Sequence, residues 1–196
     1  MGFNSEFPRR ETARVVLSDP FTDLLVAHRL ALRHPTDADW PFLYALFASF
    51  RADEMAQVAW SQDKKDAFLR EQFRLQHHHF VNHFAAADFW IVERSQSSGP
   101  NSPVGRLYLN RSPPRWLIID IGFLPEARGQ GLGSALLKWV QASASSAGAA
   151  AVDLHVVITN LRAEKLYRSL GFRNEGSAEG YHQLMVWDAA AQLNTA

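Results

Sequence analysis

The sequence contains no cysteine among its 196 residues, and its formal net charge is zero. Without cysteine the chain has no disulfide, no cysteine nucleophile and no thiolate ligand for a metal. Its 20 basic and 20 acidic side chains argue against nucleic-acid binding through bulk charge, although a local basic patch stays possible. The sequence therefore favours a neutral protein whose chemistry does not depend on thiols.

Long apolar runs are absent as well. No segment approaches the roughly 20 apolar residues that span a bilayer, and residues 1–10 lack the apolar core of a signal peptide. We therefore expect a cytoplasmic protein that neither enters a membrane nor binds nucleic acid. Apolar residues nevertheless make up 47% of the chain, which is typical of a folded globular domain.

The chain divides into an arm, one domain and a tail. Residues 1–28 carry little pattern and predict a loosely ordered N-terminal arm, and residues 189–196 form a small polar tail. Between them, residues 29–188 show the apolar periods of strands and helices. The predicted order is strand, two helices, three strands, helix, strand, helix and two strands. This order indicates an α/β or α+β domain with a mixed sheet of about six to seven strands and about four flanking helices.

The periods also set approximate boundaries for these elements. The predicted helices begin near Thr36, Ser61, Leu132 and Asn160. The strand at residues 116–124 is apolar on both faces and is expected near the centre of the sheet. The predicted strands cover residues 28–33, 89–93, 104–110, 116–124, 152–158, 172–177 and 181–188.

A glycine-rich turn, RGQGLG at residues 128–133, separates the apolar strand from the next helix. Glycines let the backbone approach a ligand closely, and a helix N-terminus adds the positive end of a dipole. The segment therefore predicts an anion site to which Arg128 adds charge. A plain turn without a ligand is one alternative. A nucleotide P-loop would need a lysine before Ser134, and a dinucleotide fingerprint would need glycine in place of Ser134.

At this turn the sequence resembles the acetyl-CoA pyrophosphate loop of the GCN5-related N-acetyltransferases. That family's pattern is Arg or Gln, two residues, Gly, one residue, then Gly or Ala, and Arg128, Gly131 and Gly133 match it. The stretch NLRAEKLYRSLGF at residues 160–172 resembles the family's second signature. Residues 32–39 resemble its first strand and helix start. The resemblance covers about residues 29–188 and offers no role for the first 28.

The resemblance implies an N-acetyltransferase that uses acetyl-CoA as its acyl donor and needs no metal. In this family a primary amine attacks the thioester directly in a ternary complex, a route with which the absence of cysteine is compatible. The implied acceptor is a small-molecule or peptide amine, and the expected state is a monomer or homodimer. An alternative from another class is a catalytically weak acyl-CoA-binding sensor or interaction module of the same fold.

The resemblance also implies roles for individual residues. Tyr167 matches the tyrosine that acts as general acid toward the leaving thiolate, although its place on an apolar helix stripe also fits a core residue. Asp120, a lone carboxylate in an apolar strand, is the candidate general base, with a hydrogen-bonded structural role as the alternative. The implied cofactor-binding residues are Ile121, Gly122, Phe123, Arg128, Gly129, Gln130, Gly131, Leu132, Gly133, Ser134, Asn160 and Tyr167.

Two of these cofactor-binding assignments have local alternatives. Gly122 interrupts an apolar strand, which marks either a bulge or a close backbone approach. The backbone from Ile121 to Phe123 is expected to pair with pantetheine and to polarise the thioester carbonyl. Asn160 suits a helix cap, and the resemblance adds a contact with the CoA arm.

Other titratable groups are weaker candidates. His155 is the second candidate base, and Asp153 shares its face of the strand. Tyr181 and His182 are candidates for lining the acceptor site. His residues at 79 and 83 have a spacing that can hold zinc on a helix, but no glutamate completes the HExxH pattern. We therefore interpret the histidine cluster at residues 77–83 as a solvated helix face.

Overall fold

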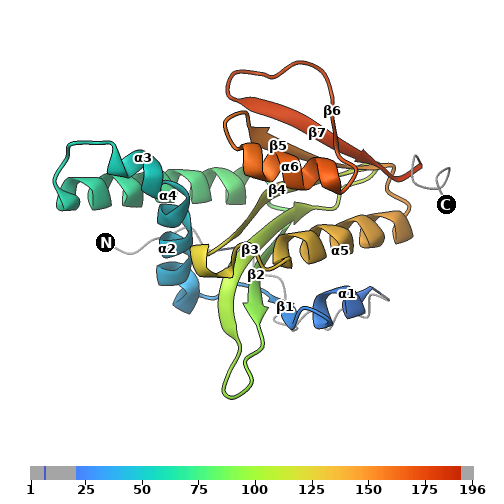
Figure 1. The fold of residues 1–196 in the computed structure, drawn as a ribbon, viewed down its shortest axis with the longest axis horizontal. Helices are drawn as coiled ribbons and strands as arrows, with labels where there is room; N and C mark the ends of the chain where they lie inside the picture. The colour runs from blue at the N-terminus through green and yellow to red at the C-terminus, as the bar shows by residue number, and fades with distance from the viewer. Residues whose placement is uncertain (1–6, 8–20, 191–196) are drawn as a thin grey trace.

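The computed structural model describes Phe7 and residues 21–190, and within them seven strands form one sheet (Figure 1). The strand order is β1-β2-β3-β4-β5-β7-β6, with β4 and β5 parallel and all other neighbours antiparallel. The expected mixed sheet is therefore confirmed. The strands are β1 (Leu30–Arg33), β2 (Asp88–Arg94), β3 (Ser102–Asn110), β4 (Arg115–Phe123), β5 (Ala151–Val157), β6 (Arg173–Asn174) and β7 (His182–Asp188).

Six α-helices accompany the sheet in the described residues, two more than the sequence predicts. The additional helices, α1 and α3, have five residues each, which is too short to show an apolar period. β6 is also shorter than the predicted strand at 172–177, because only two of its residues pair with β7. The helices are α1 (Thr22–Val26), α2 (Trp40–Phe50), α3 (Ala52–Ala56), α4 (Gln62–His83), α5 (Leu132–Ser146) and α6 (Leu161–Ser169).

Alternate residues of the central strands pack into different layers. In β2, Trp90 belongs to the core cluster that contains α1, α5 and α6, whereas Ile91 packs with α2, α3 and α4. Figure 1 shows these two groups of helices on opposite sides of the sheet. In β3 the same alternation places Leu107 in the first layer and Tyr108 in the second. Arg106 therefore faces α2 and α4, as Tyr108 does.

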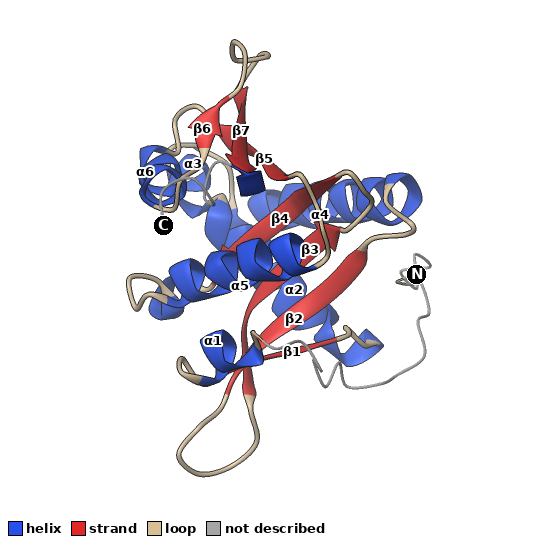
Figure 2. Cartoon of the chain, turned by 90° about the vertical axis from the view of Figure 1, so that its right-hand side faces the viewer, coloured by secondary structure: helices blue, strands red, loops and turns tan. Residues whose placement is uncertain are grey.

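The N-terminal segment contributes to this core. Leu25 of α1 is 1% exposed and joins the cluster that contains α5, and Figure 2 shows the two helices side by side. Residues 22–26 thus form a packed helix within the segment expected to be a loose arm. Phe7 stacks on Trp40 with ring centroids 5.2 Å apart. The rest of the predicted arm up to residue 20, and residues 191–196 of the predicted tail, lie outside the described residues.

Candidate functional site

β4 and β5 pair along only part of their length. Parallel pairing joins residues 115–118 of β4 to residues 151–154 of β5 and then stops. Beyond that point, Ile121–Phe123 stay paired with β3 on their other side. In the described part of the chain, the backbone groups of this segment that face β5 are outside the ladder, and such groups need hydrogen-bond partners. This is the segment expected to pair with pantetheine.

A bulge in β4 sets the direction of Asp120. The register against β3 shifts so that Tyr108 pairs with Asp120 while Leu109 pairs with Ile118, which makes Ile119 the extra residue. The bulge therefore lies at Ile119 and not at Gly122. Gly122 is instead a point of close approach, because a Cβ there would overlap the ring of Phe50 at the end of α2.

The glycine-rich turn opens α5 as the sequence predicts. Gly129 and Gly131 have φ angles of 77° and 78°, a left-handed conformation that favours glycine. The Gln130 side chain accepts a hydrogen bond from Arg94 at 2.5 Å and donates one to the carbonyl of Glu126 at 2.7 Å. These two hydrogen bonds fix the Gln130 side chain in the turn, and α5 begins at Leu132, directly after Gly131. The free N–H groups of such a helix start attract anions.

Two arginines place positive charge beside this turn. Arg128 donates from Nε to the Phe123 carbonyl at 2.8 Å and from Nη2 to Ser49 Oγ at 3.0 Å, so it also joins the end of β4 to α2. Arg162 of α6 lies close to Gly129: a Cβ atom added to this glycine would be 3.6 Å from the Arg162 Nη2 atom. Burial and then the charge of Arg162 lower the pKa of Arg128 below its ordinary value. An anion near both guanidinium groups would relieve this repulsion.

Arg106, the partner of Asp120, is not among the site residues that the sequence predicts. Arg106 is 1% exposed, and its Nη2 donates to Asp120 and, at 3.1 Å, to Gln76. Burial alone would lower the pKa of Arg106, but the attraction and hydrogen bond of Asp120, with Tyr108, raise it above its ordinary value. The sequence does contain a signal: Arg106 is the single charge in the predicted strand at residues 104–110, as Asp120 is in the predicted strand at residues 116–124.

Tyr167 lies near this pair. Its side chain is buried on α6 and its ring centroid lies 5.9 Å from that of Phe172. Burial, with a smaller effect from the charge of Asp120, raises the pKa of Tyr167 to about 12. The charge of the candidate base thus acts on the candidate acid, and the phenol stays protonated at neutral pH. Asn160 caps the same helix by accepting from the N–H of Ala163 at 3.1 Å.

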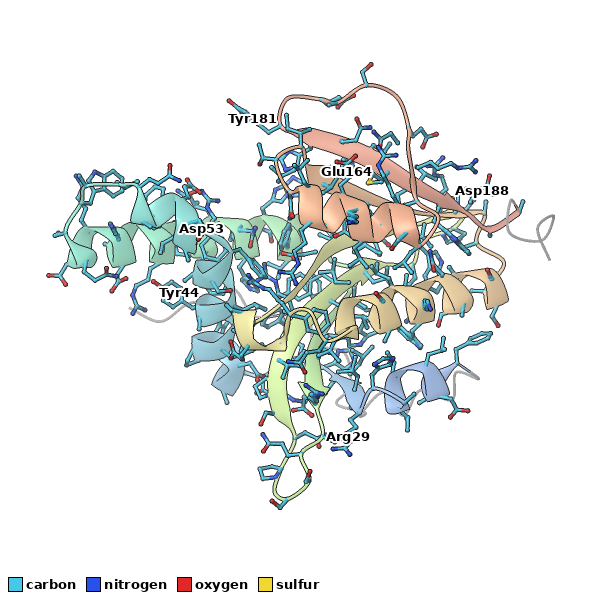
Figure 3. All side chains as sticks on the ribbon, in the orientation of Figure 1. Arg29, Tyr44, Asp53, Glu164, Tyr181 and Asp188 are labelled. Carbon is cyan, nitrogen blue, oxygen red and sulfur yellow. The ribbon has the colours of Figure 1, made fainter. Side chains whose placement is uncertain are left out.

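The remaining candidates do not join this group. The Asp153 carboxylate binds Arg115, with Oδ1 and Nη2 2.7 Å apart, as part of a surface network. His155 and His182 have exposed side chains on β5 and β7. Tyr181 is 76% exposed and projects outward from the loop before β7 (Figure 3).

The histidine cluster is also divided by the fold. His77 is buried against Trp40, with ring centroids 4.5 Å apart, so it is a core residue and not part of a solvated face. His79 and His83 are exposed and their ring centroids lie 4.1 Å apart. Over the described ranges, no group of three or more His, Cys, Asp or Glu side chains is placed to hold a metal ion. Nor is any helix there long and apolar enough to cross a membrane.

A model of the acetyltransferase (GNAT) family matches residues 43–172. The chain belongs to this family. The matched region includes the turn at residues 128–134, Asp120 and Tyr167, and it confirms the family that the two sequence motifs indicate.

Solved structures and a curated relative agree with this membership. The PaiA N-acetyltransferase of Thermoplasma acidophilum, in complex with coenzyme A, has a TM-score of 0.60 at 15% identity, covering 81% of this chain and 98% of that one. The spermidine N-acetyltransferase of Vibrio cholerae, in complex with CoA and spermine, has a TM-score of 0.56 at 22% identity, covering 85% and 99%. These structures share the GNAT fold.

The curated relative matches over a shorter stretch. The thialysine N-epsilon-acetyltransferase of Bos taurus is 43% identical over 63 residues, which are 32% of this chain and 37% of that protein. The chain thus spans little more than a third of the length of that relative.

Proposed function

We propose that the protein transfers an acetyl group from acetyl-CoA to a primary amine by direct attack in a ternary complex. One observation carries the proposal: the end of β4 that does not pair with β5 leads into a glycine turn that opens α5. The strand offers backbone partners for an extended amide chain, and the helix start offers N–H groups for phosphates. The coenzyme A complexes of structurally similar proteins support the choice of cofactor.

Each part of the cofactor has a proposed partner. The pyrophosphate would bind the backbone of residues 129–134, with Arg128 and Arg162 adding positive charge. The Leu132 side chain is buried in the core, so its contribution is its backbone N–H. Pantetheine would pair with Ile121–Phe123 and pass Asn160 at the start of α6.

The proposed chemistry uses Asp120 and Tyr167. The amine nitrogen attacks the thioester carbon, so that a C–N bond forms and the C–S bond breaks. Asp120 accepts the proton lost by nitrogen; within the described residues its Oδ1 accepts no hydrogen bond. Tyr167 donates its hydroxyl proton to the leaving thiolate. One group gains a proton and the other loses one, and exchange with water restores both.

The acceptor proposed at this level is a small-molecule or peptide amine. The names of the similar proteins, which act on a lysine analogue or on spermidine, support a small amine. A monomer or homodimer stays our prediction, although a similar spermidine N-acetyltransferase from Vibrio cholerae is dodecameric. A cytoplasmic location likewise stays a prediction from the sequence.

The test is acetyl-CoA binding by Gly131→Asp, measured by calorimetry. The substitution puts negative charge and bulk at the proposed pyrophosphate site, so affinity should fall by at least about tenfold. Gly148→Asp is the matched control, because Gly148 has a similar φ of 74° at the other end of α5. Equal affinity for the two variants would remove the assignment of the turn.

The alternative, an acyl-CoA sensor without turnover, has its own signature. Both functions predict stabilisation by acetyl-CoA, but only a transferase releases free CoA thiol when amines are added. A broad amine panel with thiol detection separates them. Binding without thiol release from any amine would favour the sensor.

A further inference from the structure

Arg106 is a buried cation with an unused donor. Its guanidinium lies near the rings of Phe50 and Tyr108, 5.9 and 5.1 Å from their centroids. Nη2 donates to Asp120 and Gln76, but the buried Nε has no hydrogen-bond partner among the described residues. A buried unsatisfied donor on a charged group is costly and calls for an explanation. The acyl-transfer reaction proposed above does not use it.

Phe50, a partly exposed residue, lies beside this guanidinium. Its ring rests against Gly122 on β4 and also lies 5.4 Å from the guanidinium of Arg128. The residue is 40% exposed at the last position of α2, so its side chain can turn toward solvent without leaving a core. Such a rotation would uncover Arg106 next to Asp120. The buried Arg106 guanidinium therefore lies one side chain away from a ligand, whereas the Asp120 side chain is already 16% exposed.

The charges of Arg106 and Asp120 indicate which kind of ligand would bind beside them. Arg106 and Asp120 together carry no net charge, and a buried site accepts a ligand most easily when the sum stays balanced. A zwitterion brings one cation and one anion, whereas a polyamine brings further positive charges beside Arg106, Arg128 and Arg162. Because Arg106 and Asp120 are in direct contact, the ligand's two charged groups must also be close neighbours.

We propose that Arg106 binds the carboxylate of an α-amino acid whose α-amine, placed at Asp120, is the acetyl acceptor. This proposal rests on the proposed function and names its substrate class. Arg106 Nε donates to the carboxylate in a charge-assisted hydrogen bond. The bound ammonium first loses one proton to water. The neutral α-amine nitrogen then forms the new C–N bond as the C–S bond breaks, its next proton passes to Asp120, and the thiolate takes the proton of Tyr167.

The first experiment compares acceptors on the full-length wild-type protein. CoA release is measured with the standard α-amino acids, with the matching α-amino acid amides and with spermidine. At least one amino acid should have a kcat/KM about tenfold to a hundredfold higher than its amide and than spermidine, since a hydrogen bond to a charged group is lost in both. An amide or spermidine that matches the best amino acid would overturn the proposal.

The second experiment changes the arginine. Arg106→Gln should reduce the ratio of kcat/KM for acid over amide to nearly one. Arg33→Gln is the matched control, because it also removes an arginine from an Arg–Asp pair, far from Asp120 in the sheet. The control should keep the wild-type ratio. If Arg106→Gln lowers turnover of acid and amide equally, Arg106 merely positions Asp120 and the proposal is wrong.

A binding measurement separates this proposal from the proposed function. Calorimetry on the protein saturated with CoA compares an amino acid with its amide and does not depend on turnover. Acid-selective binding without thiol release would support Arg106 as the carboxylate site and count against the transferase. Thiol release with amides as readily as with acids would support the transferase and remove the carboxylate site. The comparison uses wild-type protein, so it stands even if Arg106→Gln does not fold.

Discussion

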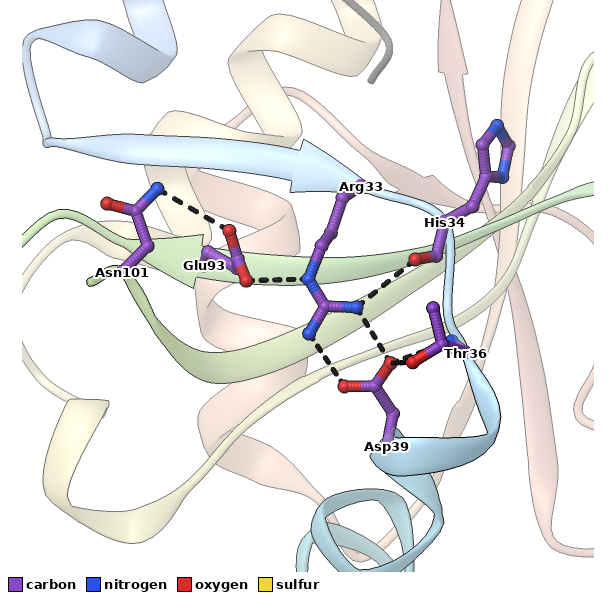
Figure 4. Close-up of polar contacts among 6 residues, drawn as sticks. All are labelled: Arg33, His34, Thr36, Asp39, Glu93 and Asn101. Atoms are coloured by element: carbon purple, nitrogen blue, oxygen red, sulfur yellow. Dashed lines mark hydrogen bonds and ion pairs between the residues drawn. The ribbon is translucent and has the colours of Figure 1, made fainter. Parts of the chain in front are cut away.

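Two arginine–aspartate pairs in this protein differ in how completely their donors are used. In the first, Arg33 Nη1 and Nη2 donate to the two oxygens of Asp39 at 2.7 and 2.6 Å, and Nε donates to Glu93 at 2.6 Å (Figure 4). In the second, Arg106 binds Asp120 through Nη2, and its buried Nε has no partner in the described chain. A saturated pair, in which every arginine nitrogen donates a hydrogen bond, joins structural elements. An unsaturated pair has a donor left that can bind a ligand.

The surroundings of the pairs match this difference. Arg33 joins β1 to β2 and to the start of α2, where Asp39 also accepts hydrogen bonds from the N–H and hydroxyl of Thr36. The Arg33 side chain is 27% exposed, so water shares in its solvation, whereas that of Arg106 is 2% exposed. The first pair therefore joins elements at an edge of the sheet. In the second pair, the buried Arg106 guanidinium depends on the Asp120 carboxylate to balance its charge.

The largest expected effect comes from removing each aspartate in turn. Asp120→Asn should lower the free energy of unfolding by about 3–5 kcal/mol, because Arg106 is left buried without a counter-charge. Asp39→Asn should cost about 1–2 kcal/mol, because Arg33 keeps Glu93 and its contact with water. Urea unfolding followed by circular dichroism measures both.

A double variant checks the reason for that difference. Replacing the pair by Arg106→Met with Asp120→Leu should recover most of the stability lost in Asp120→Asn, since no buried charge remains. Acetyl transfer should be lost in this variant, because Asp120 is the proposed base. Equal losses for Asp120→Asn and Asp39→Asn would mean that the two pairs do not differ as described.

The second prediction concerns alkaline pH, where the Arg106 region should respond and the Arg33 pair should not. Burial, the main cause, raises the pKa of Tyr108 to about 12, and burial with Asp120 does the same for Tyr167. The unfolded chain loses these protons near pH 10. The stability due to each tyrosine is therefore full below about pH 10 and is lost between pH 10 and 12, by roughly 2–3 kcal/mol each.

Tyrosine variants test this assignment. Tyr167→Phe should flatten the fall in unfolding free energy between pH 10 and 12, and it should lower turnover far more than CoA affinity. Hydrogen bonds from Arg33 to Asp39 and Glu93 raise the pKa of that guanidinium, so Arg33→Gln should leave the alkaline slope unchanged. An unchanged slope in Tyr167→Phe would show that its phenol does not titrate in this range.

The two pairs also show what the sequence could and could not predict. The apolar residues of α4 and α5 recur at helical spacing, and the glycine pattern spans only residues 128–133. Because these signals lie within short stretches of sequence, they predicted the helices, the turn and the family. Pairing of Arg106 with Asp120 is not local. It depends on the bulge at Ile119. The neighbouring isoleucines are typical of any regular strand, so they give no sign of a bulge in the sequence. One residue more or less in that strand would turn Asp120 to the other face.

Tertiary packing accounts for the other differences. The contact of Phe50 with Gly122 joins residues that no local pattern connects. Leu25 becomes a core residue because α1 packs against α5, although its own segment has no readable period. Local patterns in the sequence therefore predict turns, helices and motifs, but they do not predict contacts that depend on a partner on another element.

The smallest expected effect lies at the edge of the saturated pair. Thr36→Ala removes the hydroxyl that donates to Asp39 Oδ2 at 3.0 Å, and should cost about 1 kcal/mol of unfolding free energy, a usual value for a helix-start residue. Thr36→Ser keeps the hydroxyl and is the control. Because the Arg33 pair has no unused donor for a ligand, kcat/KM should be unchanged in both variants. A fall in kcat/KM without loss of stability would contradict the division of the two pairs into a structural and a ligand-binding one.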